Sequence, residues 1–249
     1  MRLIKEGFAI ESNSNIGHYF KGKYIIPFDK GGGSDAESGF LPNYYVETGY
    51  FLDWSCASVM SLYQRANYSS AKANLRNPDY WFIQGLTYSA RGVYSPSFRI
   101  NSCSVFDSNG SSIFFTKSKD KKFLLQILGL LTSRFIRYQI KNYCGHTIAT
   151  EVDELKGITL LENDIKFDKL INQITKAQKT NPRYDYASHE QIEIDRLVYE
   201  AYGLNADDIE EVENWFARRY PKLSAAQKEN LRKLGKSDDY LVLYGYKKE

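Results

Sequence analysis

The amino-acid sequence predicts an α+β fold, in which a β-rich region is followed by a helical carboxy-terminal region. Two observations carry this prediction. As far as residue 115, short runs rich in Tyr, Phe, Val and Ile alternate with turns rich in Gly, Asn, Asp and Ser. Beyond residue 120, apolar residues recur at steps of three and four, which is the period of an amphipathic helix. We expect two domains, residues 1–160 and residues 161–249.

Four runs in the first domain are expected to form strands, because aromatic and β-branched side chains suit a pleated, half-covered surface. They are KYIIPF (23–28), YYVETGYFLDW (44–54), VYSPSFRI (93–100) and SIFF (112–115). A mixed or antiparallel β-rich domain follows, and the pairing of its strands stays open.

A long helix is expected from Asp120 to Gly145, followed by a connection into a short strand within residues 149–161. The second domain is then helical. Its expected helices span residues 164–179, 188–203, 205–220 and 224–235. The third of these has the strongest signals, with Asn205 as its cap, acidic residues in its first turn and Pro221 directly after it.

Composition and charge narrow the class of protein. No run approaches the ~20 apolar residues of a membrane span, and the charged start is too short for a secretion signal. We therefore expect a cytoplasmic protein with no membrane partner. Three scattered Cys residues favour neither a disulfide framework nor a zinc site. Residues 1–150 hold 17 Lys and Arg against 10 Asp and Glu, a net of +7, whereas residues 151–249 hold 16 against 20, a net of −4. The basic half is the expected polyanion-binding surface.

The tetrapeptide Asn77-Pro78-Asp79-Tyr80 resembles the (Asn/Asp)-Pro-Pro-(Tyr/Phe) motif of amino-methyltransferases, in which an aromatic ring stacks on a flipped base. Asp79 replaces the second Pro. The one nearby Gly-rich turn, at residues 29–35, is not followed by the amphipathic helix that a cofactor site requires. We therefore expect a turn that leads into a strand, and no catalytic residue in this chain.

The stretch from Tyr80 to Lys119 mixes cationic, amide and aromatic residues. Arg and Gln side chains can bind base edges, and Lys, Ser and Thr can bind phosphates. The candidate DNA-binding residues are Lys23, Lys30, Gln84, Thr87, Tyr88, Ser89, Arg91, Arg99 and Lys117. Such residues also decorate ordinary exposed loops, so residue types alone leave both interpretations open.

Four segments resemble, in order and spacing, the target-recognition region of type IIG restriction–modification and BREX-type phage-defence adenine-N6 DNA methyltransferases. They are residues 23–32, 76–89, 97–114 and 124–141. The last segment also resembles the helix that ends the recognition domains of type I specificity subunits, with Thr132 where that motif has Asn. Residues 193–204 resemble a helix in the carboxy-terminal parts of these enzymes. The resemblance covers roughly residues 20–160.

This resemblance implies a target-recognition domain, residues 1–160, that reads a short asymmetric site in double-stranded DNA. The implied partner is a methyltransferase catalytic domain, on the same or a separate chain, that uses S-adenosylmethionine. No cofactor is expected in this chain, since it lacks the cofactor-binding and catalytic domain. Two alternatives stay open: a specificity-type subunit whose helical half docks a separate methyltransferase chain, and a minimal stand-alone methyltransferase that uses Asn77 to Tyr80.

Overall fold

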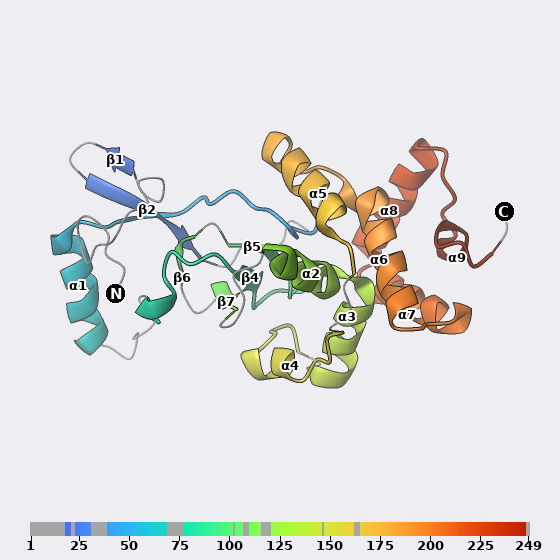
Figure 1. Ribbon diagram of the computed structural model, residues 1–249, viewed down its shortest axis with the longest axis horizontal. Coiled ribbons are helices and arrows are strands. Elements are labelled where there is room, and N and C mark those ends of the chain that lie inside the picture. Colours follow the sequence, from blue (N-terminus) through green and yellow to red (C-terminus); the bar gives the residue numbers. More distant parts are fainter. Residues whose placement is uncertain are drawn as a thin grey trace.

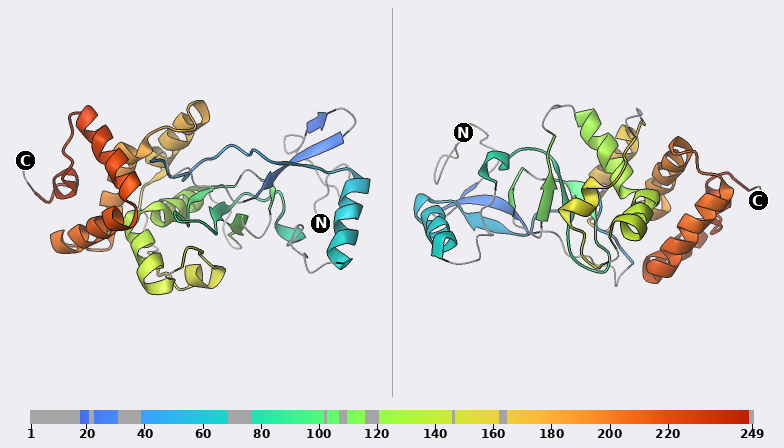
Figure 2. Two further views of the ribbon diagram at one scale, coloured as in Figure 1. Left: turned by 180° about the vertical axis from the view of Figure 1, so that it is seen from behind. Right: turned by 90° about the horizontal axis from the view of Figure 1, so that it is seen from below.

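Strands gather toward one end of the molecule and the carboxy-terminal helices toward the other (Figures 1 and 2). The fold is α+β, with a strand-rich amino-terminal half and a helical carboxy-terminal half, as the sequence predicts. It comes from a computed structural model, which describes residues 18–20, 23–30, 39–68, 77–101, 103–106, 110–115, 121–145, 147–161 and 165–247.

Two small sheets form the strand-rich half. The first contains β1 (His18–Phe20), β2 (Lys23–Asp29), β3 (Phe51–Asp53) and β6 (Val105–Phe106). Its strands β1 and β3 pair antiparallel with β2, and β6 pairs parallel with β2. The second contains β4 (Leu86–Ser89), β5 (Phe98–Ile100) and β7 (Gly110–Ile113). Strand β4 is central in it and antiparallel to both neighbours, with Thr87 opposite Arg99 on β5 and opposite Ser112 on β7.

The strand expected over residues 44–54 is much shorter in the structure, and the helix α1 (Cys56–Tyr68) that follows it was not expected. Only β3 forms there, besides an isolated bridge between Tyr44 and Arg99. The reason lies at the end of the strand. The Asp53 side chain accepts a hydrogen bond from the backbone N–H of Ser55, and the Ser55 hydroxyl accepts a hydrogen bond from the backbone N–H of Ser58. These short polar side chains end the strand and start a helix.

The long helix expected from Asp120 to Gly145 is divided. Helix α2 (Lys121–Thr132) ends at Ser133, which has extended backbone angles and caps the new helix α3 (Arg134–Gln139). The hydroxyl groups of Thr132 and Ser133 donate to the backbone carbonyls of Leu128 and Leu130, at 2.8 and 2.7 Å, and so compete with the helix ladder. A π-helical turn, η3 (Ile140–Cys144), completes the segment, which ends at Gly145 as expected.

The short strand expected within residues 149–161 is wrong. Helix α4 (Val152–Lys156) lies there instead, and none of the described residues 147–161 belongs to a named strand. A capping box explains the difference, because Glu151 and Glu154 each accept a hydrogen bond from the backbone at the start of this helix.

The four helices expected in the helical region are present with shifted ends, and η4 and α9 were not expected. It contains α5 (Asp168–Thr180), η4 (Tyr186–Ser188), α6 (Glu190–Ala201), α7 (Ala206–Arg219), α8 (Pro221–Lys233) and α9 (Tyr240–Leu243). Asn205 caps α7 as expected, accepting from the backbone N–H groups of Asp207 and Asp208. Pro221 ends α7 and is also the first residue of α8, where its fixed φ suits a helix start.

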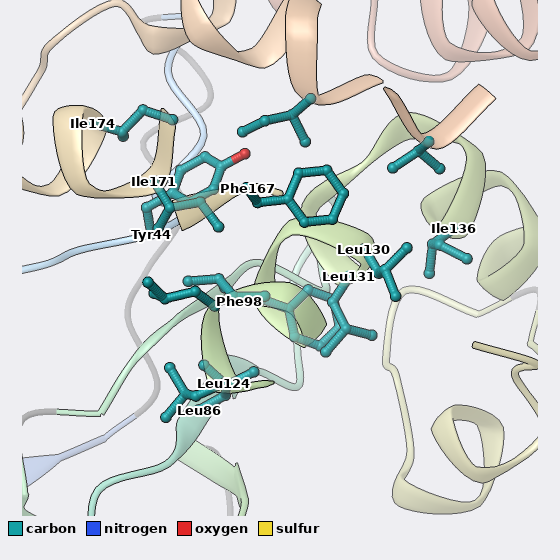
Figure 3. Packing of buried hydrophobic residues seen from close by; sticks show 14 of the residues in the cluster. Tyr44, Leu86, Phe98, Leu124, Leu130, Leu131, Ile136, Phe167, Ile171 and Ile174 are labelled. Carbon is teal, nitrogen blue, oxygen red and sulfur yellow. The ribbon is translucent and has the colours of Figure 1, made fainter. Parts of the chain in front are cut away.

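One hydrophobic core joins the two regions, so it runs across residue 160. Helix α2 lies between strands β4 and β5 and helices α5 and α6. Leu86, Leu130 and Ile171, from three of these elements, are fully buried in the core (Figure 3). The approach of α2 to the start of α5 is so close that a Cβ at Gly129 would lie 2.4 Å from the ring of Phe167. The strands are therefore held in a fixed position against the helices.

Candidate nucleic-acid interface

Strand β4 and its partner β5 carry four of the sequence-predicted contact residues, and all four are buried. The exposed fractions are 0% for Thr87, 2% for Tyr88, 5% for Ser89 and 4% for Arg99. Tyr88 packs in the main core, where burial raises the pKa of its phenol. Side chains covered to this extent cannot reach a base or a phosphate in this structure, so they belong to the framework of the candidate interface.

A polar network around Arg99 shows what these buried residues do. The Arg99 guanidinium donates to Asp29 on β2 at 2.8 Å and to the Ser89 hydroxyl on β4 at 3.2 Å. Ser97 also donates to the Ser89 hydroxyl, at 3.0 Å. Ion pairing and hydrogen bonds offset the cost of burying the charge. Arg99 therefore connects the two sheets.

The segment between β4 and β5 is anchored to helix α3. Arg137, which is 2% exposed, donates to the carbonyls of Tyr94 at 3.0 Å and of Pro96, and its guanidinium lies 5.5 Å from the ring of Tyr220. Ser95 donates to the Ser89 carbonyl at 2.9 Å. The segment thus has a defined conformation, since its backbone is held from a helix on one side and from a strand on the other.

Lys141, one turn after Arg137, holds the next segment. Its Nζ donates to the carbonyls of Thr147 and Ala149, both at 3.1 Å, and to the Thr150 hydroxyl at 2.9 Å. Burial and, to a smaller extent, the nearby charge of Arg137 lower the pKa of Lys141 to about 8. Residues 147–150 are thereby placed beside Arg91, which forms an isolated β-bridge with Ala149.

Three of the predicted contact residues are exposed: Lys30, Gln84 and Arg91. Lys30 follows β2, and its Nζ lies 5.1 Å from the centre of the Tyr50 ring. Tyr50 and its neighbour Phe51 are themselves 57% and 56% exposed. Gln84 and Arg91 lie beyond opposite ends of β4, so they do not form one compact cluster. The exposed set is therefore distributed along the sheets.

The remaining predictions fall partly outside the described residues. Lys117 lies outside them, as do residues 31–35 of the Gly-rich turn, and of Lys23 only the backbone, at the start of β2, is described. The tetrapeptide from Asn77 forms the 3-10 turn η2 (Pro78–Tyr80), which precedes β4. The Tyr80 ring stacks on Phe114 at 5.0 Å, and Tyr80 is 39% exposed. The expected turn is confirmed.

A second polar cluster lies among the carboxy-terminal helices. The Arg134 guanidinium binds Glu213 and Gln227 and lies between two rings, 4.1 Å from Phe216 and 4.9 Å from Tyr240. Asp195 accepts from the Arg134 backbone N–H at 2.8 Å, and burial raises its pKa to about 7.

Both carboxylates of this cluster are buried, at 1% exposed for Asp195 and 3% for Glu213, and each is held by neighbouring helices. Tyr199 and Tyr244 donate to Glu213 at 2.6 and 2.9 Å. The cluster therefore connects neighbouring helices to one another. Its carboxylates are too deeply buried for a substrate to reach them in this structure. Among the described residues, no group of His, Cys, Asp and Glu is placed to hold a metal ion.

One group of exposed cations was missed at the level of the sequence. Five Lys and Arg residues lie within residues 165–183, with Asp168 as the one acidic residue of that range. The net charge of −4 for the whole of residues 151–249 conceals them. A shorter window would have shown them.

Comparison of the chain with models of known protein families and with curated proteins gives no match. Within the ranges that the structure describes, no helix combines the length and the apolar character needed to cross a membrane.

Proposed function

We propose that this chain is a DNA-recognition polypeptide of a bacterial adenine-N6 methylation system of the restriction–modification or phage-defence kind. The resemblance of residues 20–160 to target-recognition regions motivates the assignment. The structural observation that supports it is that some polar residues of the strand-rich half are buried, whereas others beside the strands are exposed. The network around Arg99 is covered, whereas Lys30 and Arg91 are left in solvent on the basic half of the chain.

In the proposed mechanism, Lys30 neutralises a phosphate and Arg91 and Gln84 approach base edges or phosphates in the groove. The buried residues of β4 and β5 keep these positions fixed. Methyl transfer is assigned to a catalytic domain that binds S-adenosylmethionine, on the same or a separate chain. Calorimetric titration of this chain with S-adenosylmethionine is expected to give no binding heat.

DNA binding is tested by fluorescence anisotropy with a random-sequence duplex over rising salt. We expect binding at low salt that weakens as salt increases, because neutralised phosphates release counterions. Lys30→Ala with Arg91→Ala should weaken binding, whereas Lys156→Ala should not, since Lys156 is exposed but paired with Asp153 at 2.8 Å on α4. Absence of binding at low salt would reject the proposal for the isolated chain.

Sequence reading is tested separately, by selection from a duplex library with a randomised segment. Enrichment of a short asymmetric sequence is the expected result, since the resemblance implies such a target. Binding without any enriched sequence would leave a DNA-binding protein but would reject the recognition role.

A further inference from the structure

Helix α5 and its flanks form an exposed basic surface in the helical region. Its cations are Lys166, Lys169, Lys176, Lys179 and Arg183, and every one of them is exposed. Asp168 is the one acidic residue between 165 and 183. This segment is therefore strongly basic within a half of the chain whose net charge is negative.

The period of the helix places these cations opposite the core. Ile171 and Ile174 are fully buried against the main core. At 100° per residue, Lys169 and Lys176 lie on the opposite side of α5, two turns apart. The other exposed positions on that side are polar as well: Asn172, Gln173 and Thr180. The face thus offers cations with amide and hydroxyl groups between them and no apolar side chain.

Several cations on other helices are paired with acidic residues, whereas no ion pair joins the cations of α5 to another described residue. On α6, Arg196 pairs with Glu193 at 2.8 Å, and on α8, Lys233 pairs with Glu229 at 2.6 Å. In the described part of the chain, no carboxylate pairs with Lys166, Lys169 or Lys176. Their charges are thus available to an external anion.

The chemistry of this face favours a nucleic-acid backbone over the other anionic partners. A helix that lies on a membrane inserts its apolar face, but the apolar face of α5 is used by the protein's own core. Protein interfaces are centred on buried aromatic or aliphatic anchors, which the exposed face of α5 lacks. Lysines separated by Asn, Gln and Thr are the residue types that bind phosphate and sugar.

Helix α5 is joined to an extended segment of the strand-rich half. Gln178 of α5 accepts from the Tyr45 backbone N–H at 3.1 Å and donates to the Asn43 carbonyl at 3.0 Å. Lys179 lies 5.5 Å from the centre of the Tyr45 ring. Tyr45 and Tyr50 belong to the extended segment that passes α5 on its way to β3 (Figure 1). Cations at both ends of this segment, Lys179 and Lys30, stack on its tyrosines.

A surface hollow of about 240 Å³ lies where α5 meets this segment. Lys179 and Arg183 line it, together with Glu47 on the opposite wall. Because Glu47 weakens the positive potential there, the strongest anion attraction is assigned to Lys169 and Lys176, farther along the helix.

We propose that the exposed face of α5 is a second DNA-contact surface, which binds phosphates of the duplex beside the segment that Gln84 and Arg91 contact. This inference rests on the proposed function, since it assumes that the duplex lies along the strand-rich half. It assigns the contacts to Lys169 and Lys176, with Asn172 and Gln173 between them. These contacts add affinity without adding sequence preference.

The test compares two charge-reversed forms of the full chain. In one, Lys169→Glu and Lys176→Glu reverse the α5 face; in the other, Arg218→Glu and Lys233→Glu make the same change in net charge on α7 and α8. Circular dichroism melting establishes that both forms are folded. Affinity for a random-sequence duplex and its dependence on salt are measured by anisotropy, with wild type and the double substitution of Lys30 and Arg91 to Ala alongside.

The α5 form should lose roughly tenfold or more in affinity at ~0.1 M salt, and its log–log salt slope should fall by about two, because two phosphate contacts are lost. The affinity of the α7–α8 form should stay close to that of the wild type.

Equal losses of affinity in both forms would show a net-charge effect and overturn the inference. Loss in the Lys30 and Arg91 form with none in the α5 form would overturn this inference alone, whereas a wild type that does not bind would overturn the proposed function. The nucleic-acid assignment would be overturned if the wild type bound phosphatidylserine vesicles but no duplex, and if the α5 form no longer bound the vesicles.

Discussion

Strand β4 and helix α5 both carry polar side chains of the types that contact DNA, yet they use them in opposite ways. On β4, Thr87 and Ser89 are buried and hydrogen-bonded within the protein. On α5, Lys169 and Lys176 are exposed and have no carboxylate partner among the described residues. The first set stabilises the fold, and the second is available for binding. Substitutions should therefore separate the two, since one set should change the free energy of unfolding and the other the affinity for DNA.

The largest effect is expected for Arg99→Ala. It removes the guanidinium that pairs with the partly covered Asp29 carboxylate and should lower the free energy of unfolding by about 3–5 kcal/mol. Urea denaturation measures this change. Arg91→Ala is the matched control, because Arg91 is exposed and should cost less than about 0.5 kcal/mol. Equal costs for the two arginines would contradict the assignment of Arg99 to the framework.

A smaller effect is expected where the two regions meet. Gly129→Ala places a Cβ against the Phe167 ring and should lower the free energy of unfolding by about 1–3 kcal/mol. The higher helix propensity of Ala offsets part of this loss. Gly157→Ala serves as the control, because the nearest atoms to its Cβ would be at ordinary distances from 3.5 Å. A Gly129→Ala protein as stable as wild type would indicate that α2 and α5 can separate.

A pH-dependent effect is expected for Asp195→Asn, which keeps an acceptor for the Arg134 backbone N–H. Burial raises the pKa of Asp195 in the folded protein to about 7, from an ordinary value of 3.8. A raised pKa contributes stability below the unfolded value, and that contribution is lost as pH rises through the folded value. As the pH rises from 4 to 7, the free energy of unfolding of the wild type should therefore fall relative to that of Asp195→Asn. Urea denaturation at several pH values in this range measures the difference. Parallel profiles would show that Asp195 is ionised throughout.

The smallest effect on stability is expected for Lys176→Ala, within about 0.5 kcal/mol, because the side chain is exposed and unpaired with any described carboxylate. Ile174→Ala on the same helix should cost about 2–5 kcal/mol, since Ile174 is fully buried. Thermal denaturation of both variants gives the comparison. A strong loss of stability in Lys176→Ala would contradict an exposed binding face on α5.

Much of the helical region could be predicted from the sequence, because its signals are local. Asn205 and Pro221 mark the ends of α7 through hydrogen bonds and backbone angles within a few residues of each. The break at Ser133 and the helix at Glu151 were missed because hydroxyl and carboxylate groups there compete with the expected backbone pattern.

The candidate site was harder to predict than the fold. The burial of Arg99 depends on Asp29, seventy residues away, and no local pattern distinguishes a covered arginine from an exposed one. For α5 the signal was present in the sequence but was averaged with the acidic residues of α7. Residue type thus indicated what chemistry is possible, and long-range packing decided which residues can perform it.

Helix α3 bears on how such a protein would position a catalytic partner. Within two turns, its Arg134 binds Glu213 of α7, and its Arg137 binds the backbone of the segment that joins β4 to β5. One short, buried helix therefore sets the angle between the helical region and the strands. In the assembly that we propose, a catalytic domain attached to these helices would therefore have a fixed orientation relative to the strands.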